Sequence, residues 1–142
     1  MPPTRSNSSI PSPEFLRASS GWFFSPVLLE GKWSVIRDEG FSARGAVYST
    51  DPKSSVTLRF VGTEISWIGL QGPDQGKANV YIDGELRETV DAYSENRQVM
   101  AELFSARGLI NGLHTIRVQV EGAENNKISD KGIVVDAFDF IR

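Results

Sequence analysis

The sequence predicts an all-β fold, an antiparallel β-sandwich or jelly roll, and three observations support this prediction. Short runs rich in β-branched and aromatic residues recur along the chain, turn residues separate them, and no convincing helical stretch interrupts them. Regularly spaced short strands of this kind are typical of sandwiches and barrels. A chain of 142 residues is long enough for one domain with its own hydrophobic core and too short for two domains of typical size.

The chain divides into two parts by composition. Residues 1–21 are rich in serine and proline and lack periodicity, so we expect a disordered linker or tail there. From Trp22 onward the composition changes to β-type runs separated by turn residues. Residues 22–142 are therefore expected to form a single β-sandwich domain.

Each expected strand is an apolar or alternating run between turn residues. Alternation is clean in residues 113–121, where Ile116, Val118 and Val120 share one face of the strand. The dipeptide Asp83-Gly84 favours a tight hairpin, because a type I′ turn needs positive φ at both central residues. The expected strands cover residues 33–37, 46–49, 55–61, 64–69, 77–82, 85–90, 98–105, 113–121 and 133–141.

Strand order also predicts where the loops lie. If successive strands alternate in direction, every second connection lies at the same end of the sandwich. The tight turns at residues 62–63, 83–84 and 108–112 then fall at one end. The long polar connections gather at the other end, which we call the rim: residues 51–54, 71–76, 91–97 and 122–131. Long loops on a rigid scaffold commonly carry binding chemistry, although they can also be solvated connections without a function.

Composition and charge exclude several classes of function. The net charge of −3 and the pI of 5.2 disfavour a nucleic-acid partner, which needs a clustered basic excess. No apolar run approaches the ~20 residues that a membrane span requires, so no membrane partner is expected. The absence of cysteine excludes disulfides and zinc sites with cysteine ligands.

Ordered sequence blocks run through the chain from Trp33-Ser34 onward. They include Gly62-Thr63-Glu64-Ile65-Ser66-Trp67-Ile68-Gly69, Gly72-Pro73-Asp74-Gln75-Gly76-Lys77-Ala78, Val80-Tyr81-Ile82-Asp83-Gly84 and Val135-Asp136-Ala137-Phe138. With these blocks the chain resembles a family of bacterial galactose-binding-like modules. The resemblance spans roughly residues 30–141. It implies a galactose-binding-like sandwich of the kind appended to polysaccharide-active enzymes, similar to a carbohydrate-binding module.

Sugar binding requires a flat aromatic face flanked by planar polar groups that bond to the hydroxyls. Tyr93 with Arg97 on one long connection meets this description, whereas Trp33, Trp67 and Tyr81 are expected to be packing residues. The candidate ligand-binding residues are Gln71, Asp74, Gln75, Tyr93, Arg97, Asn125 and Asn126 in the long connections, and Tyr48 just before the turn at Asp51.

The sequence does not favour catalysis. The only histidine, His114, shares a strand face with Ile116 and is placed by strand order at the tight-turn end, so it is expected to be structural. The acidic residues are scattered and mostly in turns, whereas a glycosidase needs two carboxylates held across a cleft. We therefore expect the module itself not to be an enzyme.

Asp136 is the one candidate metal ligand. Regular alternation places it on a strand face with Val134, Phe138 and Phe140, where an ionised carboxylate needs partners. It could bind a structural Ca²⁺, for which Glu30 and Glu39 are distant co-ligands, or accept hydrogen bonds from the protein, which is the interpretation that we favour. No cofactor is required under the second interpretation.

Together these observations predict a non-catalytic carbohydrate-binding module that binds a polysaccharide or oligosaccharide through the rim. The resemblance implies a covalently linked catalytic domain and a location outside the cell or at its surface. The alternative is a structural spacer or protein-interaction domain that binds no glycan.

Overall fold

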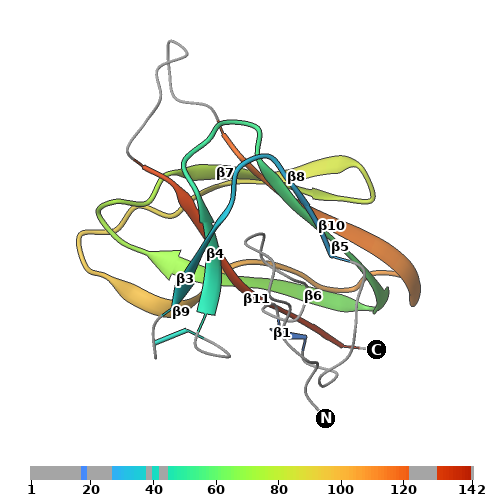
Figure 1. Ribbon diagram of the computed structural model, residues 1–142. Helices are drawn as coiled ribbons and strands as arrows, with labels where there is room; N and C mark the ends of the chain where they lie inside the picture. The colour runs from blue at the N-terminus through green and yellow to red at the C-terminus, as the bar shows by residue number, and fades with distance from the viewer. Residues whose placement is uncertain (1–16, 19–26, 38–39, 42–44, 122–130, 142) are drawn as a thin grey trace.

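The computed structural model describes residues 17–18, 27–37, 40–41, 45–121 and 131–141. In these residues all regular structure is β, as the sequence predicts (Figure 1). The strands in chain order are β1 (Arg17–Ala18), β2 (Val27–Glu30), β3 (Ser34–Arg37), β4 (Gly45–Ser49), β5 (Ser55–Gly62), β6 (Glu64–Gln71), β7 (Lys77–Ile82), β8 (Glu85–Asp91), β9 (Gln98–Ala106), β10 (Gly112–Val120) and β11 (Ile133–Ile141).

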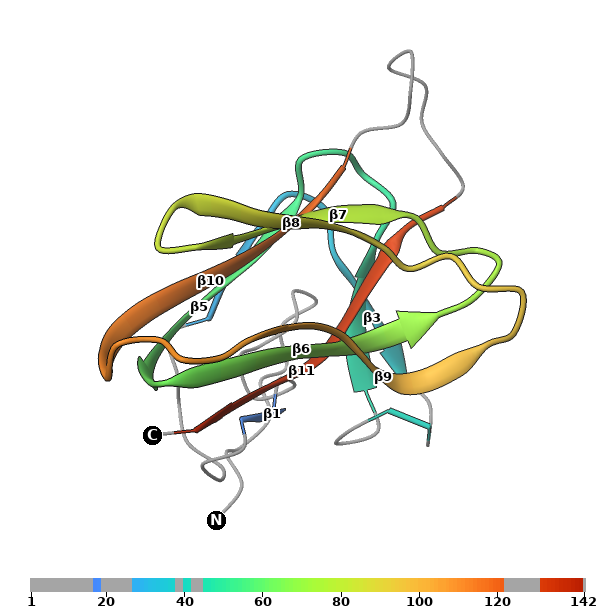
Figure 2. The same cartoon turned by 180° about the vertical axis from the view of Figure 1, so that it is seen from behind.

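The strands form two sheets that lie face to face (Figure 2). One sheet is six-stranded, with the order β3-β4-β11-β6-β9 and with β1 added beside β11. The other sheet is five-stranded, with the order β2-β5-β10-β7-β8. Only the pairing of β1 with β11 is parallel among the described strand pairs. The prediction of an antiparallel β-sandwich is therefore confirmed.

Two strands were not expected from the sequence. In β2 the outward-facing Leu28 is apolar and 55% exposed, so the strand lacks the alternation that identified its neighbours. In β1, Arg17 and Ala18 pair with Ala137 and Phe138 of β11, so two residues of segment 1–21 contact the sandwich. All other strands agree with the expected ones to within two residues at each end.

The main core lies between the two sheets. Alternate residues of β5, Val56, Leu58 and Phe60, point into it and are at most 3% exposed. Trp67 of β6 is fully buried, and its Nε1 donates a hydrogen bond of 3.2 Å to the carbonyl oxygen of Val134. Burial of each large apolar side chain stabilises the fold by about 1.5–3 kcal/mol, so the sandwich can hold its loops without disulfides.

A second, smaller cluster lies on the outer face of the six-stranded sheet. Ala46, Leu70 and Val134 alternate along their strands with residues that line the main core, so they point to the opposite face, where Phe41 packs with them. Tyr48 packs against this cluster and is half-buried. The outer face of this sheet is therefore apolar beside Tyr48.

The edge strands β8 and β9 are irregular. The register of β8 against β7 shifts between Val80 and Tyr81. The register of β9 against β6 shifts twice, and Met100 in β9 has a φ of 51°. Six of the seven residues of β8 are exposed. Neither edge presents a long, flat, apolar strand.

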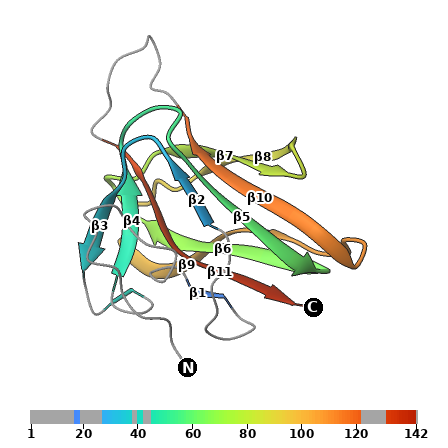
Figure 3. The ribbon, with the colours of Figure 1, turned by 45° about the vertical axis from the view of Figure 1, so that its right-hand side comes forward.

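The tight turns and the long connections lie at opposite ends of the sandwich (Figure 3). The turns at residues 62–63, 83–84 and 108–112 lie at one end, where Leu109 N bonds to Thr63 O at 2.9 Å. The connections at residues 71–76 and 91–97 lie at the other end. This separation determines where a ligand could reach several loops at once.

Candidate functional site

The described connections of the rim are joined by backbone hydrogen bonds. Residues 71–76 lie between the connection after β8 and the start of β11. On one side Gly72 N donates to Ala92 O at 3.2 Å, and Ala92 N donates to Gly76 O at 2.9 Å. On the other side Gly76 N donates to Gly132 O at 2.9 Å, and Gly132 N donates to Asp74 O at 3.2 Å. These bonds fix the loop backbone, so the side chains on it project from a defined frame.

The connection at residues 51–54 joins the others through β10. Lys53 N donates to Val120 O at 2.9 Å, and Val120 N donates to Ser54 O at 2.8 Å. The next residue, Glu121, bonds through its N to Lys77 O at 3.0 Å. The predicted gathering of the long connections is therefore confirmed for the three that the structure describes. Of the fourth, residues 122–130 lie outside the described residues.

Tyr93 is the exposed aromatic of the rim. Its side chain is 48% exposed, its backbone N bonds to Asp91 Oδ1 at 3.0 Å, and Lys131 Nζ lies 4.9 Å from the centre of its ring. A cation at this distance attracts the π face of the ring. We call the surface formed by Gln71, Asp74, Tyr93, Arg97 and Lys131 the Tyr93 patch.

The loops that carry the Tyr93 patch are in close contact at Gly72. A Cβ on Gly72 would lie 3.1 Å from Asp74 Oδ1 and 3.9 Å from Arg97 Cα. The predicted candidates Asp74 and Arg97 are both exposed, and Gln71 is half-buried on the same loop as Asp74. The structure thus places the loop segments that carry Gln71, Asp74, Tyr93 and Arg97 next to one another.

Gln75 is in a different position from the one that the sequence suggested. Gln75 is 1% exposed, and its Nε2 donates a hydrogen bond of 3.1 Å to Asp74 Oδ1. Among the described residues, no hydrogen-bond partner faces its Oε1. The loop packs this amide inward because Gln75 bridges to Gly132 across the rim. Gln75 therefore holds Asp74 in place from below and is not available on the surface. The candidates Asn125 and Asn126 lie outside the described residues.

Tyr48 lines a separate pocket. The pocket has a volume of about 290 Å³ and is lined by Lys32, Ser34, Tyr48, Ser49, Thr50 and Asp51. We call it the Tyr48 pocket. It lies where β3 meets β4, since Ser34 is the register partner of Tyr48. Ligand pockets in proteins typically begin at roughly 300 Å³, so this one is suited to a small ligand.

Several residues of these surfaces were not selected from the sequence. Lys131 was included only as the end of a long loop, and its contact with the Tyr93 ring depends on a pairing between distant strands. Lys32 and Ser34 precede and begin a short edge strand and come near Thr50 only through the β3–β4 register. No local pattern could have identified them. Asp51 and Thr50 carried one signal, their place at a turn next to Tyr48.

Asp136 is fully buried at an irregularity in β11. The register of β11 against β6 shifts between Val135 and Ala137, so Asp136 is the extra residue of a β-bulge. Val135 and Phe138 both line the main core. The expectation that Asp136 shares a face with Val134, Phe138 and Phe140 is therefore wrong, because it assumed unbroken alternation. Across the described ranges, no three His, Cys, Asp or Glu side chains converge as a metal site.

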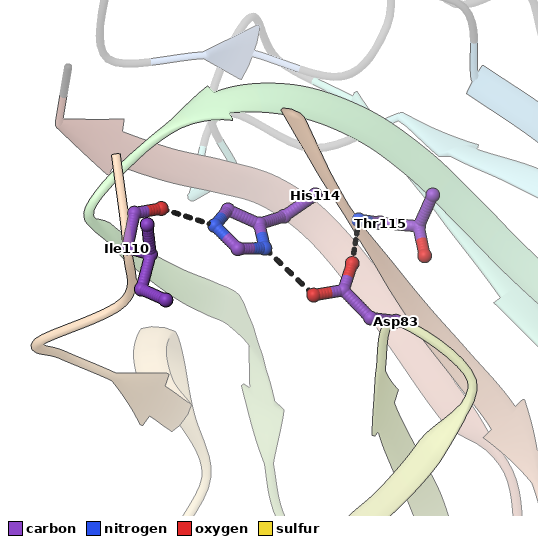
Figure 4. A network of polar contacts seen from close by, with 4 residues as sticks. All are labelled: Asp83, Ile110, His114 and Thr115. Carbon is purple, nitrogen blue, oxygen red and sulfur yellow. Dashed lines mark hydrogen bonds and ion pairs between the residues drawn. The ribbon is translucent and has the colours of Figure 1, made fainter. Parts of the chain in front are cut away.

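At the opposite end, His114 lies in a closed polar network (Figure 4). Its Nδ1 lies 2.6 Å from Asp83 Oδ2 and its Nε2 lies 2.6 Å from Ile110 O. The backbone N of Thr115 donates to the other oxygen of Asp83 at 2.9 Å. Both ring nitrogens face acceptors, so the doubly protonated ring satisfies the network best. The geometry agrees with a structural role for this histidine.

In this network the charged form of His114 and the charged form of Asp83 each favour the other. The hydrogen bond to Ile110 O and then that to Asp83 raise the pKa of His114 above its usual value, against the effect of burial. Burial alone would raise the pKa of Asp83, but the bonds from His114 and Thr115 outweigh it and lower that pKa. The contacts thus favour the charged forms of both side chains, of which His114 is 13% exposed and Asp83 is 48% exposed.

The described part of the chain contains no helix that is long and apolar enough to cross a membrane. This finding concerns only residues 17–18, 27–37, 40–41, 45–121 and 131–141.

Two bacterial enzymes contain a segment that is similar in sequence to this chain. An A type blood N-acetyl-α-D-galactosamine deacetylase of Flavonifractor plautii is 36% identical over 92 residues, which cover 65% of this chain and 12% of the enzyme. An A type blood α-D-galactosamine galactosaminidase of the same organism is 35% identical over 92 residues, which cover 65% of this chain and 8% of the enzyme. The chain thus matches only a small part of these curated relatives. No family model matches it.

A solved structure shares the fold. It is a family two carbohydrate esterase from Clostridium thermocellum in complex with cellohexaose, with a TM-score of 0.57 and 21% identity. The match covers 80% of this chain and 30% of that chain. At this identity the likeness shows the fold and no more. The chain is therefore an antiparallel β-sandwich that is similar to parts of carbohydrate-active enzymes.

Proposed function

We propose that the chain is a non-catalytic, galactose-binding-like carbohydrate-binding module. It binds a glycan through the Tyr93 patch at the rim and needs no cofactor to do so. In the full-length protein it is linked to a polysaccharide-active catalytic domain, outside the cell or at its surface. By holding that domain near its substrate, the module raises the local concentration of reactive sites.

The observation that supports this proposal most strongly is that two enzymes with different named activities both contain a segment similar to this chain. One is a deacetylase and the other a galactosaminidase, so the two enzymes break different bonds. A segment that occurs in both, and that amounts to 12% and 8% of their lengths, is better suited to a shared recognition task than to either reaction. Both enzymes act on carbohydrate by name, which supports a glycan as the ligand of this chain.

The geometry of the rim supports the Tyr93 patch as the binding surface. A tyrosine face that is 48% exposed offers an apolar plane to the C–H face of a sugar. Arg97 and Lys131 supply donors, while Asp74 and Gln71 supply acceptors for the hydroxyls. The backbone bonds that join Gly72, Ala92 and Gly132 hold these groups in place before the ligand arrives, which reduces the entropy lost on binding.

The proposal is tested by titrating the 142-residue chain with a panel of soluble polysaccharides and oligosaccharides in a calorimeter. We expect saturable binding that Tyr93→Ala weakens by about tenfold or more, because the stacking surface is lost. Arg97→Ala is expected to weaken binding as well. Tyr81→Ala is the matched control, because Tyr81 lies on the five-stranded sheet away from the rim. Retention of wild-type affinity by both rim variants would place the site elsewhere, and absence of binding to every glycan would favour the spacer alternative.

A further inference from the structure

We propose that the Tyr48 pocket is a second sugar subsite, separate from the Tyr93 patch, and that it takes a single neutral pyranose residue. The pocket is lined by Lys32, Ser34, Tyr48, Ser49, Thr50 and Asp51. This inference rests on the proposed function, because it assigns a second point of contact with a glycan to the same module.

The pocket is built by two turns that Ser54 ties together. Ser54 Oγ accepts a hydrogen bond of 2.9 Å from Lys32 N and donates one of 3.3 Å to Asp51 Oδ2. Its backbone N bonds to Asp51 O at 3.2 Å. Gly31 has a φ of 92°, and a side chain there would collide with Ser54. The turn before β3 and the turn after β4 are thus held against each other, so the walls of the pocket are formed in advance of a ligand.

The Tyr48 ring is held against the start of β11. A Cβ on Gly132 would lie 2.7 and 2.8 Å from two atoms of this ring, which shows that the ring packs directly on the glycine. Tyr48 also packs against the apolar cluster of the outer sheet face. A ring that is fixed in this way and half-buried presents an apolar wall, against which the C–H face of a pyranose can lie.

The other lining groups match the hydroxyls of a neutral sugar. Ser34, Thr50 and Asp51 offer hydroxyl and carboxylate oxygens, and Lys32 offers an ammonium donor. Among the described lining residues there are one cation, Lys32, and one anion, Asp51, and their formal charges cancel. Lys32 would attract a uronate and Asp51 would repel it, and the reverse holds for an amino sugar, so the lining favours neither charge. A charged sugar would still lose hydration on entry, and a neutral sugar loses less. A volume of about 290 Å³ limits the occupant to a small ligand such as one sugar ring.

The two sites lie on different sides of one short segment. Lys131 contacts the Tyr93 ring, and the next residue, Gly132, contacts the Tyr48 ring. Successive residues of an extended chain point to opposite sides. Occupation of one site therefore does not require the other, and a substitution in one should leave the other intact.

The test is a titration of the isotope-labelled full chain with galactose, glucose and mannose as neutral probes, followed by amide shifts in two-dimensional NMR. Galacturonate and galactosamine are the charged probes. We expect a neutral sugar to shift amides of residues 32–34 and 48–51 in the wild type and equally in Tyr93→Ala. Thr50→Val removes one hydroxyl and should weaken binding at these amides by about two- to tenfold. Thr57→Val, the same change on β5 outside the lining, should have no effect.

The outcomes separate the two proposals. Shifts at the pocket that survive Tyr93→Ala and weaken in Thr50→Val support the subsite, whatever the fate of the Tyr93 patch. Shifts confined to residues 71–76 and 91–97 overturn the subsite and leave the proposed function standing. Equal or tighter binding of galacturonate overturns the assignment to a neutral sugar. Absence of shifts with every probe overturns the subsite, while polysaccharide binding in the calorimeter would still support the module function.

Discussion

The two ends of the sandwich use polar side chains in different ways. At the tight-turn end, both nitrogens of His114 and both oxygens of Asp83 have partners within the protein. At the rim, the loop backbone is bonded internally, whereas the ring of Tyr93 is 48% exposed and Arg97 is exposed. At the tight-turn end these polar side chains bond within the protein and stabilise the fold. At the rim, Tyr93 and Arg97 remain exposed on a backbone that hydrogen bonds hold in place.

In a chain with few chemical motifs, the partners of a polar side chain help to distinguish a structural group from a binding group. A histidine that bonds to a carboxylate often suggests a catalytic site. Here the pair stabilises a turn. Ile110 O bonds to the second ring nitrogen of His114, and Thr115 N bonds to the second carboxylate oxygen of Asp83. A group whose partners are all internal stabilises the fold and has little capacity left for a ligand.

The largest effect is expected from Gly132→Ala at the rim. The new Cβ would lie 2.5 Å from Ser49 O and 2.7 Å from the Tyr48 ring, so backbone or ring must move. We expect the free energy of unfolding in urea to fall by about 1–3 kcal/mol, as for other overpacked sites. Gly108→Ala is the control, because it has a φ of 70° and no atom within 4 Å. It should lose only about 1 kcal/mol from left-handed strain, and a larger loss at Gly108 than at Gly132 would contradict the tight packing of the rim.

A smaller effect is expected from pH at the tight-turn end. The pKa of His114 is raised in the folded chain, so its contribution to stability is complete below the unfolded value of about 6.5 and is lost as pH rises through the folded value. The pKa of Asp83 is lowered, so its contribution is present above about 3.9 and is lost as pH falls through the folded value. Stability from the pair should therefore be greatest between about pH 4 and 6.5.

The measurement is urea unfolding of the wild type and of His114→Gln at several pH values from 5 to 9. The variant should lose the decline in stability that the wild type shows above about pH 6.5. Glycan affinity at the rim should be unchanged in the variant at fixed pH. A decline that persists unaltered in His114→Gln would show that another group controls it.

The smallest effect is expected from Lys131→Met. This change keeps the apolar stem of the side chain and removes the ammonium that lies over Tyr93. An exposed cation–π contact contributes about 0.5–1 kcal/mol and here holds the ring in place. Losing this preorganisation should lower glycan affinity by no more than about two- to fivefold. Calorimetry on the same glycan as for Tyr93→Ala gives the comparison. A loss as large as that of Tyr93→Ala would mean that the charge, and not the ring, governs binding.

Much of the fold could be predicted because its cause is local. The alternation of Ile116, Val118 and Val120 and the turn at Asp83-Gly84 each depend on residues that are neighbours in sequence. Asp83 and Gly84 both have positive φ in the structure, as the hairpin requires. The gathering of the long connections followed from strand direction alone.

The details of the candidate site could not be predicted, because they arise from irregularities and distant pairings. The bulge at Asp136 reverses the faces of the residues after it, which a regular period of two cannot reveal. The inward turn of Gln75 depends on its bridge to Gly132, far along the chain. Lys131 reaches Tyr93 only because residues 71–76 pair with the start of β11 on one side and with the connection after β8 on the other.

The irregular edge strands β8 and β9 have a consequence for the carbohydrate-binding module proposed above. On a polymer with many repeats, copies of the chain would stand close together, and a flat unpaired strand would invite them to join edge to edge. Charged residues along β8, among them Glu85, Arg87 and Glu88, and the broken register of β9 work against such joining. If the chain acts as proposed, neighbouring copies would therefore not join through β8 or β9.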